Sequence, residues 1–156
     1  MPGGQTRSAA AQDPSWPAYK EAVLEFRIGE PFRIWLAEPL VPADREQLAA
    51  LLPAGKFAVV TPYNPHGRKV PAAENEARLR REQQELTARG LRHLRVDGLA
   101  PDGSHCEEGY AVELPRHDAR ELAERWGQSA FFWFDGSDFW LVPAEVDAEA
   151  VRLPAS

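Results

Sequence analysis

The most restrictive feature of the sequence is a pair of aromatic segments near its C-terminal end. Phe131-Phe132-Trp133-Phe134 and Phe139-Trp140 flank residues 135–138, whose Asp-Gly pair is typical of a hairpin turn. The segments are apolar on both faces that a strand would present, which is typical of a strand buried within a sheet. The alternatives are a partner-binding surface or an exposed stacking platform. We favour the core, because a domain of 156 residues needs large apolar side chains to fill its interior.

Further elements follow from hydrophobic periodicity and from the positions of proline and glycine. Apolar residues at helical spacing predict helices, and alternating or β-branched runs predict strands. Helices are expected over residues 41–52, 72–89 and 115–126, with a short one at 16–20, and strands over residues 22–28, 32–36, 56–61, 91–96, 110–114, 130–134 and 139–142. This mixed order predicts an α/β or α+β fold, in which helices pack on a partly antiparallel sheet as a single layered sandwich.

Length and composition favour one domain. A hydrophobic fraction of 44% is enough for one buried core, and 156 residues leave no room for two. We expect a flexible N-terminal tail over residues 1–14, a single α/β domain over residues 15–143 and an acidic C-terminal tail over residues 144–156.

Several functional classes are disfavoured by composition. A formal charge of −6 argues against broad nucleic-acid or membrane binding. The lone Cys106 and the spacing of the four histidines give no metal-ligand pattern, so no metal site and no cofactor are expected. No nucleophile elbow or phosphate-binding glycine motif is present. The chain starts without an apolar run, which predicts a cytoplasmic protein.

The segment that links the strand at 56–61 to the next helix is the first candidate site. We call residues 62–71 the Asn-Pro loop. Asn64 precedes a proline, which predicts an extended backbone and a fixed side-chain direction. Residues 66–95 carry eight basic and four acidic groups, so Arg68 and the start of the helix could hold an anion. Asn75 is expected on the inward side of that helix, where it needs a partner. The alternative is a stiff connector with solvated charges.

Two adjacent acids, Glu107 and Glu108, form the second candidate. Neighbours on a strand point to opposite faces, so the two glutamates are not a catalytic pair, and one of them faces inward or lies at the sheet edge. An inward carboxylate needs a partner, and Arg68 or Arg78 could supply it. The alternative is a charged strand start on the surface.

Four short motifs resemble those of the bacterial domain-of-unknown-function 3293 (DUF3293) family. They are Thr61-Pro62-Tyr63-Asn64-Pro65, Glu74-Asn75-Glu76, Glu107-Glu108-Gly109-Tyr110 and Trp126-Gly127-Gln128-Ser129-Ala130. Relative to the family pattern, Pro62-Tyr63 replaces Ala-Trp, Gly109 replaces Ser and Trp126 replaces Phe. The resemblance brings no activity, and it implies that Asn64, Asn75, Glu108 and Gln128 are signature positions.

These positions favour recognition over acid/base chemistry, because carboxamides read hydrogen-bond patterns but are poor bases. We expect a small polar or anionic, nucleotide-like ligand at the Asn-Pro loop, bound by Asn64, Arg68, Asn75, Glu108 and Gln128. One alternative is a hydrolase or transferase with Glu108 as general base. Another is a protein-interaction module that uses the aromatic hairpin.

Overall fold

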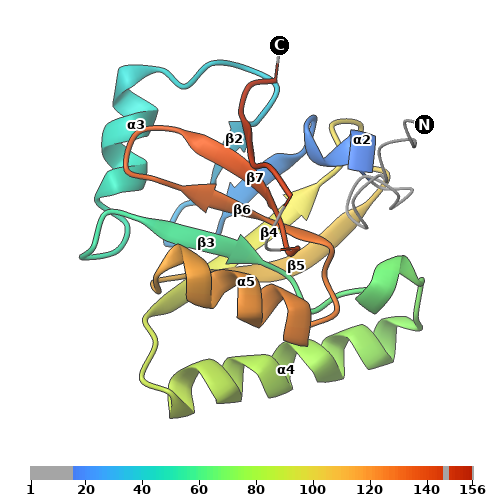
Figure 1. Cartoon of the computed structure of the whole chain (residues 1–156). Coiled ribbons are helices and arrows are strands. Elements are labelled where there is room, and N and C mark those ends of the chain that lie inside the picture. Colours follow the sequence, from blue (N-terminus) through green and yellow to red (C-terminus); the bar gives the residue numbers. More distant parts are fainter. Residues whose placement is uncertain (1–15, 146–147, 156) are drawn as a thin grey trace, which may run out of the picture.

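Two antiparallel hairpins that the sequence predicts lie toward opposite ends of one curled sheet (Figure 1). In the computed structural model, which describes residues 16–145 and 148–155, β1 (Val23–Phe26) pairs with β2 (Phe32–Trp35), and β6 (Ala130–Phe134) pairs with β7 (Phe139–Pro143). The remaining strands are β3 (Phe57–Val60), β4 (His93–Leu99), β5 (Cys106–Val112) and β8 (Val151–Arg152). The strand order is β2-β1-β4-β5-β3-β6-β7-β8.

Two helical crossovers set the order of the central strands. Helix α4 (Ala72–Ala88) connects β3 to β4, and α5 (Arg116–Arg125) connects β5 to β6. The two strands that each crossover connects have one other strand between them in the sheet, and this middle strand runs antiparallel to both. Every neighbouring pair in the described sheet is therefore antiparallel, whereas the sequence predicted a partly antiparallel sheet. The prediction of a mixed α+β domain is confirmed.

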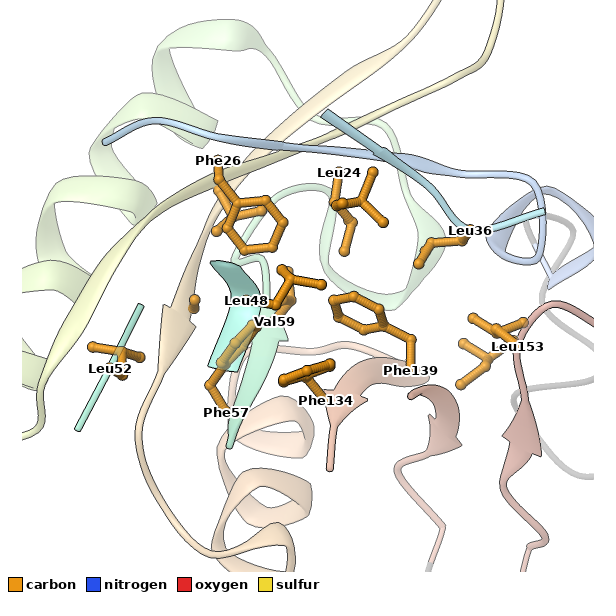
Figure 2. Packing of buried hydrophobic residues seen from close by; sticks show 14 of the residues in the cluster. Leu24, Phe26, Leu36, Leu48, Leu52, Phe57, Val59, Phe134, Phe139 and Leu153 are labelled. Atoms are coloured by element: carbon orange, nitrogen blue, oxygen red, sulfur yellow. The ribbon is translucent and has the colours of Figure 1, made fainter. Parts of the chain in front are cut away.

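Alternation along the strands sorts the apolar side chains into two cores, one on each face of the sheet. On β3, Phe57 and Val59 face a core that Leu48 of α3 (Pro42–Ala49) completes (Figure 2). The intervening side chains of β3 face a second core, which α4 and α5 cover with Leu79, Leu86 and Leu122, together with Trp126 directly after α5. Burial of each large side chain contributes about 2 kcal/mol to the free energy of unfolding.

The aromatic hairpin contributes side chains to both cores, as the sequence predicts. Phe134 packs in the first core and Trp133 in the second, while Phe132 and Trp140 are half-buried. Among the described residues, the large hydrophobic side chains with high exposure are Trp35 and Val41, which lie away from this hairpin.

The two ends of the chain differ in what the structure describes. The expected N-terminal tail lies outside the described residues, which begin with the short helix α2 (Trp16–Tyr19). The segment predicted as an acidic C-terminal tail contains β8, which pairs with β7, and Leu153, which is buried in the first core. Within the described ranges, no helix has the length and apolar character needed to cross a membrane.

Candidate functional site

The Asn-Pro loop leaves β3 and turns sharply at Asn64. The backbone of Asn64 is left-handed, with φ 47° and ψ 60°, and His66 in the following 3-10 turn (Pro65–Gly67) also has a positive φ of 60°. The prediction of an extended Asn64 is therefore wrong. Asparagine adopts this conformation more readily than most residues, because its side chain can bond to nearby backbone.

Asn64 and Asn75 form a reciprocal amide pair that holds this turn. The Asn64 backbone N–H donates to Asn75 Oδ1 at 2.9 Å, and Asn75 Nδ2 donates to Asn64 Oδ1 at 3.1 Å. Asn64 Oδ1 also accepts from the Val70 backbone N–H at 3.1 Å. Asn75 lies in the first turns of α4 with 6% of its surface exposed. The inward Asn75 thus has the partner that its burial requires.

The loop is also tied to the C-terminal end of α5. Arg78 donates from Nε to the Pro62 carbonyl at 2.6 Å and from Nη2 to the Trp126 carbonyl at 2.9 Å. Gln128 Nε2 donates to the Tyr63 carbonyl at 2.8 Å. These bonds satisfy carbonyl groups of the loop and of the helix end, which would otherwise be left without partners.

A glycine lets the end of α5 approach the loop closely. The Gly127 carbonyl accepts from the His66 backbone N–H at 2.6 Å. Gly127 has a φ of +76°, and a Cβ at this position would lie 2.7 Å from Pro65 Cβ. Both the backbone conformation and the available space therefore require glycine here.

Glu107 and Glu108 point to opposite faces of β5, as strand alternation predicts. Glu107 Oε2 accepts from Asn64 Nδ2 at 3.0 Å and lies 3.1 Å from His105 Nε2. Glu108 Oε2 accepts from the Tyr63 hydroxyl at 2.8 Å, and its other oxygen lies 3.4 Å from Arg95 Nη2. The partners of the two acids are therefore different from the predicted Arg68 and Arg78.

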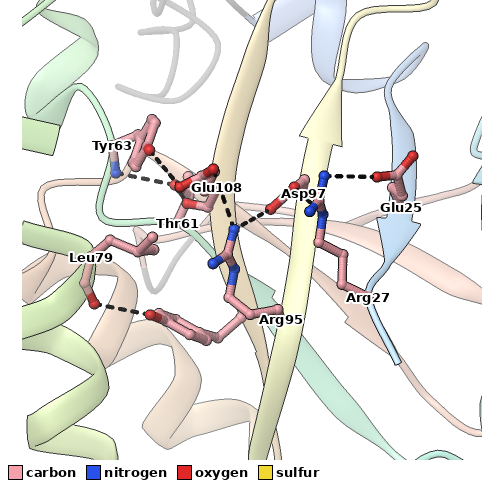
Figure 3. A network of polar contacts seen from close by, with 9 residues as sticks. Glu25, Arg27, Thr61, Tyr63, Leu79, Arg95, Asp97 and Glu108 are labelled. Atoms are coloured by element: carbon pink, nitrogen blue, oxygen red, sulfur yellow. Dashed lines mark hydrogen bonds and ion pairs between the residues drawn. The ribbon is translucent and has the colours of Figure 1, made fainter. Parts of the chain in front are cut away.

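Glu108 belongs to a row of charges that crosses three strands, β5, β4 and β1 (Figure 3). At its centre, Asp97 is 1% exposed and contacts Arg95 Nη2 at 3.0 Å and Arg27 Nε at 2.8 Å. At its end, burial and the hydrogen bond to Glu108 raise the pKa of the Tyr63 hydroxyl, so it stays protonated at neutral pH. The predicted general base is thus bound to a hydroxyl and a guanidinium.

A cavity of about 520 Å³ lies on the opposite face, where Glu107 points. Its floor is apolar and comes from β1, β3, β4, β6 and β7, with Leu24, Val59, Val96, Phe132 and Leu141. Its polar lining includes Asn64, Lys69, His105, Glu107 and Gln128. Gly98 also lines the cavity and pairs across the strands with both Leu24 and Glu107, so the floor lacks a side chain next to the carboxylate.

The structure places the predicted site residues in three environments. Asn64 and Gln128 line the cavity, whereas Asn75 is buried behind Asn64. Arg68 is exposed on the loop, and Glu108 faces the charged row on the other side of the sheet. All five lie on or against the Asn-Pro loop or its neighbouring strand, but only two reach the cavity.

Two residues outside the predicted set of ligand-binding residues are central to the arrangement; the sequence names Glu107 only beside the favoured Glu108, and it gives no signal for Arg95. Glu107 is the acid that faces the cavity, and Arg95 is the partner of Glu108. Strand alternation predicts that Glu107 and Glu108 point to opposite faces of the sheet, but only the register of β5 decides which of them faces the cavity. Among the described residues, no group of three or more His, Cys, Asp or Glu side chains is placed to hold a metal ion.

Fold and site together define an antiparallel α+β domain with a ligand-sized cavity beside a braced loop. A family model described as "Protein of unknown function (DUF3293)" matches residues 60–131. This match confirms the resemblance seen in the sequence, over residues 60–131. No curated protein and no solved structure matches the chain. The matched segment holds the whole Asn-Pro loop, α4, β4, β5 and α5.

Proposed function

We propose that this domain binds a small nucleotide-like molecule in the cavity beside the Asn-Pro loop. The observation that carries the proposal is the cavity itself: about 520 Å³, with an apolar floor and polar groups at one side. Small-molecule sites have this size and this division between apolar walls and a few polar groups. A flat ring fits the floor beside Phe132, while the polar groups orient it.

The bracing of the loop supports binding rather than mere packing. Asn64 is fixed by bonds to Asn75 and Val70, so its side chain needs no reordering when a ligand arrives. A site that is ordered in advance loses less conformational entropy on binding. Lys69 lines the cavity and the exposed Arg68 precedes it, so an anionic group would meet positive charge at the loop.

Calorimetric titration with the 5′-monophosphates of adenosine, guanosine, cytidine and uridine tests this function. We expect saturable one-to-one binding of at least one nucleotide. Gly98→Val is the matched blocking variant, because a Cβ at Gly98 meets nothing closer than 3.8 Å and its side chain would enter the cavity. The variant should keep its fold and lose binding. If no nucleotide binds, or if Gly98→Val binds as well as the unchanged chain, the proposal fails.

A further inference from the structure

The polar lining of the cavity is rich in acceptor oxygens. Glu107 is an acceptor-only group when ionised, and both of its contacts with Asn64 Nδ2 and His105 Nε2 are made by Oε2. Oε1 is therefore the carboxylate oxygen that a ligand would use. Gln128 adds a second oxygen, because its side-chain hydrogen bonds within the described part of the chain are donated by Nε2.

The floor next to Glu107 allows a ring to come close edge-on. Gly98 lies directly across the strands from Glu107 and carries no side chain. Gly109, two residues further along β5, also lines the cavity. Lys69 and His105 are both exposed, so solvent screens them more than it screens Glu107, which has 22% of its side chain exposed. Glu107 is thus less exposed than the two basic side chains that line the cavity.

We infer that Glu107 selects a ring whose edge donates hydrogen bonds from neighbouring N–H groups, as the guanine base does. This inference rests on the proposed function and names its ligand class. The guanine edge carries an N1–H and an exocyclic amine side by side. Oε1 of Glu107 has two lone pairs and can accept from both N–H groups of such a pair, and hydrogen bonds to a charged acceptor are stronger than neutral ones. The adenine edge places an acceptor nitrogen there, which Glu107 repels.

Three nucleotides that differ only in the base edge test the assignment: guanosine, inosine and adenosine 5′-monophosphate. Inosine lacks the exocyclic amine of guanosine. The unchanged chain should bind the guanosine nucleotide about tenfold more tightly than the inosine nucleotide, the ratio that one hydrogen bond to a charged acceptor supplies, and the adenosine nucleotide most weakly.

Glu107→Gln is the decisive variant, because it keeps the shape and replaces one acceptor by a donor. It should reduce the preference for guanosine over inosine to less than about threefold. Lys69→Ala is the control, since loss of a charge that faces the phosphate weakens all three nucleotides equally and keeps their ratio. The ratio of the guanosine and inosine affinities does not depend on the fraction of folded protein, because a partial loss of folded protein lowers the apparent affinity for every nucleotide by the same factor.

Each outcome decides a different claim. A guanosine preference that Glu107→Gln removes supports the inference. Equal binding of the three nucleotides, or a preference that survives in Glu107→Gln, overturns the inference and leaves the proposed function standing. If none of the three nucleotides binds, while cytidine or uridine monophosphate does, the guanine class is excluded. If none of these nucleotides binds, the proposed function fails first and the inference fails with it.

Discussion

The amide pair between Asn64 and Asn75 should be a principal source of stability for the Asn-Pro loop. Asn75→Ala removes two hydrogen bonds and leaves the Asn64 backbone N–H without its partner. An unsatisfied buried donor costs about 1–3 kcal/mol, and the second bond contributes about 1 kcal/mol. Alanine recovers about 0.5 kcal/mol through its higher helix propensity. We therefore expect a net loss of about 2 kcal/mol in the free energy of unfolding.

Urea unfolding followed by tryptophan fluorescence measures this loss, since the chain has five tryptophans. The midpoint should fall while the m-value is unchanged. In a thermal melt the same loss lowers the Tm by about 6 °C for a domain of this size. Glu76→Ala is the matched control, because Glu76 is the exposed neighbour of Asn75 on the same helix and its removal should change stability by less than about 0.5 kcal/mol.

Asn75→Asp separates the two bonds. The aspartate keeps an acceptor for the Asn64 N–H, but it sets a second oxygen against Asn64 Oδ1 where the amide donates across 3.1 Å. It should therefore destabilise the domain by about 1 kcal/mol or more. If Asn75→Ala and Glu76→Ala lower stability equally, the pair does not brace the loop and the reasoning is wrong.

Two further perturbations test the packing of the loop and of α4. Gly127→Ala should destabilise the domain by about 2 kcal/mol in a thermal melt, because it adds a clash with Pro65 to the strain of a positive φ; Gly29→Ala, with φ +59° and open space around it, should show only the strain of about 1 kcal/mol. Burial and a hydrogen bond to Glu85 raise the pKa of the Glu82 carboxyl above its ordinary value of 4.5. The protonated carboxyl therefore stabilises the folded domain below pH 4.5, and this contribution is lost as the pH rises through the raised pKa. Glu82→Gln should thus be more stable than the unchanged chain at pH 7, with a difference that shrinks toward pH 4 in urea midpoints; a constant difference across this range would contradict the assignment.

The local elements could be predicted from the sequence because their signals are local. Helical spacing of apolar residues located α3, α4 and α5 to within a few residues, and turn residues located both hairpins. The antiparallel order could not be predicted, because it depends on which strand is inserted between the two ends of each crossover. That choice is made by long-range pairing of β5 with β3, which no short segment encodes.

The sequence predicted which loop borders the cavity, but it did not predict which acid faces the cavity or which residue pairs with Glu108. Asn64 of the Asn-Pro loop and Gln128 line the cavity. The choice between Glu107 and Glu108 depends on strand register, and a slip of one residue would exchange their faces. Arg95 was missed because its partner lies on a neighbouring strand, 13 positions away in the sequence.

The bonds that anchor the Asn-Pro loop join positions 11, 16, 45 and 65 residues apart. Closing such spans carries a large entropic cost, which favours their formation late in folding. The rim of the cavity therefore exists only in chains whose helices and central strands have all assembled. A molecule that occupies the cavity would bind only completely folded chains and would shift the folding equilibrium toward them. The folded fraction of the protein would therefore increase with the concentration of that molecule.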